Sequence, residues 1–105
     1  MNDKKQSHVL IEKLFSVNAP KKINIWIHEL NEINKLLETN SENQLVKDRF
    51  IELNCNCGDF FIKNEQYEQA KPYFEAADRI AYPGHYTQFH ISVMLLTIAE
   101  KLLIK

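Results

Sequence analysis

The chain has 105 residues, of which 45% are hydrophobic and 26% are charged, as in a single small globular domain and unlike a disordered chain. Two glycines and three prolines are too few for an all-β protein, which needs turn residues wherever the chain reverses. Thirteen Lys and Arg against 14 Asp and Glu give a net charge of −1. This balance predicts no binding to duplex nucleic acid or to an anionic membrane.

The two cysteines are too few and too close in sequence for a disulfide framework. The polar N-terminus does not have the apolar core of a signal peptide, and no apolar run approaches the length of a membrane span. We therefore expect a cytoplasmic protein with free thiols.

Hydrophobic periodicity predicts an all-α chain of about five helices, with residues 1–6 as a frayed tail and the whole of 1–105 as one domain. Ser7 is placed to cap a short first helix. The second helix, about 20–38, has the clearest two-faced pattern. Its apolar stripe consists of Ile23, Trp26, Ile27, Leu30, Ile33 and Leu37.

The third and fourth helices are expected at about 42–63 and 66–81. Ser41, followed three residues later by Gln44, predicts a capping box at the start of the third helix. Asn64 is expected to take the left-handed conformation that ends it.

The last helix, about 86–103, is apolar over much of its circumference. One stripe consists of Ile91, Leu95, Ile98 and Leu102, and further apolar residues lie off it, namely Val93, Met94, Leu96 and Leu103. This helix is therefore either enclosed by the others or presents a surface to a partner. A homodimer formed through this C-terminal helix is one hypothesis.

Small and aromatic residues recur through the third and fourth helices, at Gly58, Phe61, Tyr67, Ala70, Phe74, Ala77 and Ile80, with Pro83 after them. In this register, about 51–84, the segment resembles one degenerate copy of a tetratricopeptide repeat, a helix–turn–helix unit. It departs from the family at Asn54, where a large residue is usual, and at Glu65, where the turn commonly has glycine. The resemblance implies helices stacked as antiparallel hairpins, as in a fragment of an α-solenoid. Any helical hairpin with small residues at its crossing would give the same pattern.

The resemblance also implies a binding face. Proteins of this family hold peptides or protein surfaces along the concave face formed by the first helix of each repeat. That face would here consist of Glu52, Cys55, Asp59, Ile62 and Lys63. Its two carboxylates would repel a carboxylate ligand, so we expect a partner protein with a basic or neutral contact surface. Alternatively, Glu52 and Asp59 simply belong to the solvated face of the helix.

The sequence shows no pattern of a catalytic, metal or cofactor site. Cys55 and Cys57, two residues apart on a helix, point in nearly opposite directions, and no second pair of zinc ligands follows them. The four histidines are scattered and are expected at surface or boundary positions; His90 could pair with Asp78 or Glu100 only through a tertiary contact. Neither a phosphate-binding glycine loop nor a nucleophile elbow is present.

The function predicted from these features is that of a non-catalytic protein-binding module. The first hypothesis is a small inhibitor or immunity-type protein that masks a partner's surface or active site. Acidic residues of the third and fourth helices would supply the masking charge, namely Glu52, Asp59, Glu65, Glu68, Glu75 and Asp78. The alternatives are an adaptor or chaperone of the tetratricopeptide type that binds a peptide and, more remotely, a small enzyme or nucleic-acid-binding protein.

Overall fold

The computed structural model describes residues 19–104, which form helices and their connections without any strand. The helices are α2 (Ala19–Thr39), α3 (Gln44–Lys63), α4 (Tyr67–Ile80) and α5 (Gln88–Ile104). The all-α prediction is confirmed for this part of the chain, and the expected helix bounds agree with the structure to within two residues. The tail and the short helix expected after Ser7 lie outside the described residues.

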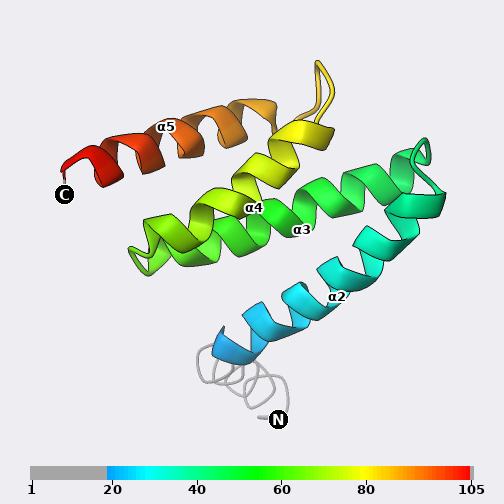
Figure 1. The fold of residues 1–105 in the computed structure, drawn as a ribbon, viewed down its shortest axis with the longest axis horizontal. Coiled ribbons are helices and arrows are strands. Elements are labelled where there is room, and N and C mark those ends of the chain that lie inside the picture. Colours follow the sequence, from blue (N-terminus) through cyan, green and yellow to red (C-terminus); the bar gives the residue numbers. More distant parts are fainter. Residues whose placement is uncertain (1–18, 105) are drawn as a thin grey trace, which may run out of the picture.

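The four described helices pack mainly against their neighbours in sequence. The most extensive contact joins α3 to α4, and smaller contacts join α2 to α3 and α4 to α5. In Figure 1 α4 lies across α3, with α2 on the far side of α3 and α5 along the outer edge of α4. Both α3 and α5 therefore pack on α4 rather than extensively on each other.

The residues at the two ends of α3 differ from those expected. Asn43, rather than Ser41, caps its start, because its Oδ1 accepts the N–H groups of Leu45 and Val46 at 3.0 and 3.2 Å. The predicted capping box is therefore wrong. At the other end Asn64 has a φ of −95°, and the left-handed residue is Glu65, with a φ of 58°. Glu65 occupies the turn position at which the resemblance would place a glycine.

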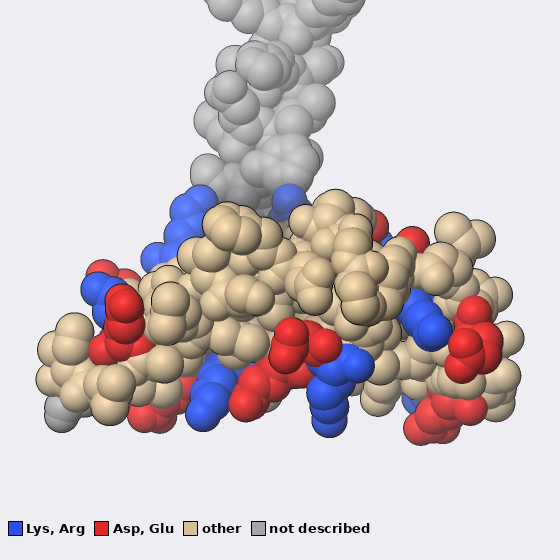
Figure 2. Space-filling model, turned by 90° about the horizontal axis from the view of Figure 1, so that it is seen from above, with Lys and Arg blue, Asp and Glu red and all other residues tan. Residues whose placement is uncertain are grey.

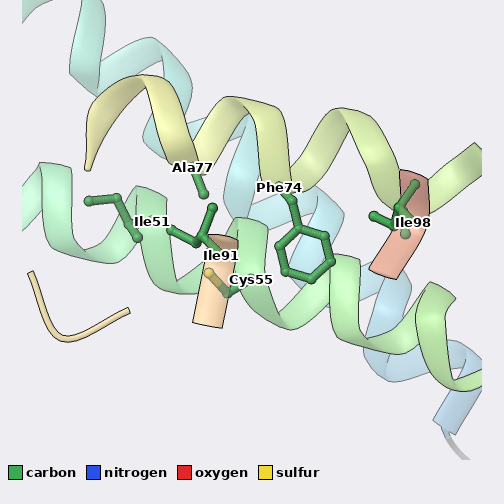
Figure 3. Close-up of a cluster of buried hydrophobic side chains, with 7 residues drawn as sticks. Ile51, Cys55, Phe74, Ala77, Ile91 and Ile98 are labelled. Carbon is green, nitrogen blue, oxygen red and sulfur yellow. The ribbon is translucent and has the colours of Figure 1, made fainter. Parts of the chain in front are cut away.

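A buried cluster holds α3, α4 and α5 together, consisting of Ile51, Cys55, Ala70, Phe74, Ala77, Ile91 and Ile98. Figure 3 shows Phe74 pointing from α4 toward α3. A Cβ atom on Gly58 would lie 2.5 Å from Cε2 of this ring. The predicted close approach of the two helices at Gly58 is confirmed, and Ala70, the other small residue expected there, is fully buried.

The apolar stripe of α2 faces the interior, as expected: Ile23 is buried and the other five residues are half-buried. An ion pair also fastens α2 to α3. The Arg49 guanidinium donates from Nε and Nη2 to the two carboxylate oxygens of Glu29, at 2.6 and 2.8 Å. These hydrogen bonds hold the pKa of Glu29 below its usual value.

The apolar stripe of α5 also lies where the sequence places it, with Ile91 and Ile98 buried and Leu95 and Leu102 half-buried. The opposite side of this helix is exposed along its length. None of the described helices combines the length and the apolar character needed to cross a membrane.

Candidate functional site

An open groove with a volume of about 470 Å³ lies between α3 and the segment that enters α5. Its lining residues are Glu52, Cys55, Asn56, Asp59, Tyr86, Thr87 and His90. The other three residues from α3 follow Glu52 by three, four and seven positions, so all four share one face of that helix. Both α3 and α5 pack on α4, and among the described residues the space between them is open on this side.

Two polar bridges cross the groove from wall to wall. The Tyr86 hydroxyl donates to Oε1 of Glu52 at 2.6 Å, and Nε2 of His90 lies 2.7 Å from Oδ1 of Asp59. The Glu52 carboxylate, by accepting this hydrogen bond, raises the pKa of Tyr86 to about 12. The His90 ring also meets the edge of Phe74, with their centroids 5.9 Å apart. This contact connects His90, in the groove wall, to the buried core residue Phe74.

The groove carries negative charge. Within residues 19–104, its lining contains two carboxylates and neither lysine nor arginine. The nearest described cation to Glu52 is Arg49, whose Nη1 lies 3.6 Å from Oε2. That guanidinium is already held by both oxygens of Glu29. One positive charge is therefore shared by two carboxylates, and the described residue that bridges to Asp59 is His90, through its imidazole.

The cysteine in the groove is a neutral thiol. Burial, followed by the nearby charges of Asp59 and Glu52, raises the pKa of Cys55 to about 12. Burial alone raises the pKa of Cys57 to about 11. A protonated thiol is a poor nucleophile and a poor metal ligand. Within residues 19–104 no three His, Cys, Asp or Glu side chains converge in a way that could hold a metal ion.

The loop before α5 is organised around His85, whose side chain is buried between two tyrosines. The ring centroids of Tyr82 and Tyr86 lie 5.0 and 4.5 Å from that of His85. Nδ1 of His85 accepts the backbone N–H of Thr87 at 3.2 Å and lies 2.6 Å from its hydroxyl. The ring proton is therefore assigned to Nε2, which lies 3.3 Å from Oδ1 of Asp48 but not in hydrogen-bonding geometry. The stacking on His85 holds Tyr86 where its hydroxyl reaches Glu52.

Three of the six predicted site residues, Glu52, Cys55 and Asp59, line the groove. The other three lie elsewhere. Ile62 packs against the buried cluster, Lys63 is exposed at the end of α3, and Glu75 is exposed on α4.

Sequence reasoning did not assign Asn56, Tyr86, Thr87 or His90 to the site. His90 does form a tertiary contact, but with Asp59 rather than with Asp78 or Glu100. One available signal is the spacing of Tyr86 and His90, which places two polar aromatic residues one helical turn apart at the start of the predicted 86–103 helix.

No protein-family model, curated protein or solved structure matches this chain. Its function is therefore inferred from the chemistry of the groove. Partly satisfied carboxylates can accept further hydrogen bonds from a cation that enters from solvent. Tyr86 is 71% exposed at the rim, and the ring face turned away from His85 offers a flat surface against which a guanidinium can stack.

Proposed function

We propose that the chain is a non-catalytic protein-binding module whose groove receives a basic side chain of a partner protein. The observation that carries this proposal is the pair of α3 carboxylates, Glu52 and Asp59, in an open groove where no lysine or arginine of the described part of the chain lines the wall. Charge-assisted hydrogen bonds to carboxylates are among the strongest that a protein surface offers. A partner with a basic contact surface satisfies this geometry best.

Two observations support binding rather than catalysis. The Cys55 thiol has a pKa of about 12 and stays protonated at neutral pH. His90 directs its Nε2 to Asp59, and among the described residues no hydrogen bond joins it to Cys55. A nucleophile and an adjacent base, which covalent catalysis requires, are therefore not paired in the groove.

Within this class we place first a small inhibitor or immunity-type protein that masks a cationic surface or active site. The exposed carboxylates of Glu68 and Glu75 on α4 would extend the negative field beyond the groove. The second candidate is an adaptor or chaperone that holds a peptide. It is supported by the position of the groove between alternate helices, α3 and α5, where the tetratricopeptide resemblance implies a concave face. Two unpaired cysteines support a cytoplasmic location.

Binding of a short, fluorescently labelled arginine peptide, measured by anisotropy at low salt, tests the groove. We expect the double variant Glu52→Gln/Asp59→Asn to weaken binding by about tenfold or more, because two charge-assisted hydrogen bonds are lost. The matched control is Glu38→Gln/Glu42→Gln, which removes the same charge from exposed positions around the turn between α2 and α3, outside the groove lining. Equal weakening by both variants, or absence of binding by the parent chain, would contradict the proposal.

Competition between the labelled peptide and a whole partner protein distinguishes an adaptor from an inhibitor. An adaptor binds the free peptide with an affinity close to that for its whole partner. An inhibitor needs the folded surface of its target, so the peptide should compete only weakly with a captured partner protein.

A further inference from the structure

The outer face of α5 is an exposed apolar stripe that none of the described helices covers. Phe89, Leu96 and Leu103 are 81%, 64% and 84% exposed, and they follow one another at intervals of seven residues. Val93 lies between the first two, and Ile104 adjoins the last. The opposite stripe of the same helix is buried on α4. Figure 2, seen from above relative to Figure 1, shows a mostly uncharged central surface with charged side chains along its upper and lower margins and at its ends.

A spacing of seven residues is that of helices that pair along their length, because it keeps large apolar side chains on one seam. No Asp, Glu, Lys or Arg occurs from position 88 to position 99. Two copies of this face can therefore approach without charge repulsion along the first two-thirds of the helix. The groove uses a different side of α5, through His90, so both surfaces can be occupied at once.

We propose that a second copy of this chain covers the face, with the two α5 helices antiparallel and crossing at Leu96. A twofold axis at this residue makes each contact reciprocal. Phe89 then faces the partner's Leu103, and Val93 faces the partner's Ala99, so that a larger side chain meets a smaller one. A parallel pairing would instead bring Glu100 and Lys101 beside their own copies, which like charges disfavour.

The area of the exposed α5 face indicates how tightly the expected dimer associates. A helix of 17 residues is about 25 Å long. Pairing two such faces would bury roughly 1,200 Å² in total, at the low end of specific interfaces. We therefore expect a dimer that dissociates on dilution.

Sedimentation equilibrium over a range of concentrations tests the proposal. We expect the apparent mass to rise from 12.4 kDa to twice that value. Leu96→Glu places two carboxylates face to face on the axis and should abolish the rise. The control Leu45→Glu makes the same change at an 81% exposed leucine in the first turn of α3, where an acidic side chain is tolerated. It should leave the dimer intact, and circular dichroism should show both variants folded.

Disulfide trapping tests the orientation. The native thiols Cys55 and Cys57 are buried, so new surface cysteines can be oxidised selectively. A mixture of Phe89→Cys and Leu103→Cys chains should give mainly the mixed disulfide, since antiparallel helices bring these positions together. Three results would overturn the proposal: a parent chain that stays monomeric at all concentrations, a Leu96→Glu variant that still dimerises, or Phe89→Cys chains that link mainly to one another.

Discussion

The two sides of α3 are held to the rest of the molecule in different ways. The side that faces α4 is dry and closely packed, with the Phe74 ring against the backbone of Gly58. The side that faces the 82–90 segment is acidic, and its carboxylates contact polar side chains across a gap. These pairs are Asp48 with Tyr82, Glu52 with Tyr86 and Asp59 with His90, at 3.3, 2.6 and 2.7 Å.

The difference separates stability from binding along a single helix. Close packing leaves no room for a ligand, and enlarging a side chain within it lowers the free energy of unfolding. Polar bridges between partly exposed groups contribute little to stability, but they keep two walls apart at a fixed spacing. Changes on the packed side should therefore alter the free energy of unfolding, and changes on the acidic side should alter binding.

The largest expected effect comes from Gly58→Ala on the packed side. The added methyl would overlap the fully buried ring of Phe74, and overpacking of this kind costs about 1–3 kcal/mol. This cost should exceed the helix propensity gained by replacing glycine, about 1 kcal/mol. Urea unfolding should therefore show a clear loss of stability.

The matched test is Gly58→Ala combined with Phe74→Leu, which removes the ring that the methyl meets. In this background the alanine should cost less than in the parent chain, since the two positions are coupled. A Gly58→Ala chain as stable as the parent would show that the helices are not in close contact at this point.

A smaller effect of opposite sign is expected at the turn that joins α3 to α4. Glu65 has a φ of 58°, a conformation that costs a non-glycine residue about 1–2 kcal/mol. Glu65→Gly should therefore raise the free energy of unfolding by about 1 kcal/mol. The reverse change, Gly84→Ala at a φ of 90° with no atom within 4 Å of the new methyl, should lower it. Destabilisation by Glu65→Gly would contradict the assigned turn.

The smallest effect on stability is expected at the bridge between Tyr86 and Glu52. The folded-state pKa of Tyr86, about 12, lies above the unfolded value of about 10. The stabilisation linked to this group is therefore complete below pH 10 and is lost as the pH rises toward 12. Titration of the tyrosine ring signals by NMR should show one group that titrates last, and Glu52→Gln should lower its pKa. A Tyr86 that titrates near 10 in the parent chain would mean that the bridge is not formed.

The helices could be predicted from the sequence because each depends on the order of residues along one segment. Three of the seven residues that line the groove could also be predicted, since Glu52, Cys55 and Asp59 lie on one face of one helix. Tyr86 and His90 were not assigned, because their role depends on how the loop before α5 returns to α3. The start of α3 shows the same limit on a small scale: Ser41 and Asn43 both have capping chemistry, and only the chain geometry selects Asn43.

Backbone NMR with the arginine peptide tests the two-sided account of α3 most directly. We predict that the amide signals of the groove residues shift on titration, namely Glu52, Cys55, Asn56, Asp59, Tyr86, Thr87 and His90. Signals from the packed side, such as Ile51, Gly58 and Phe74, should move little. Shifts centred on α2 or on the exposed face of α4, with the groove signals unchanged, would contradict the account.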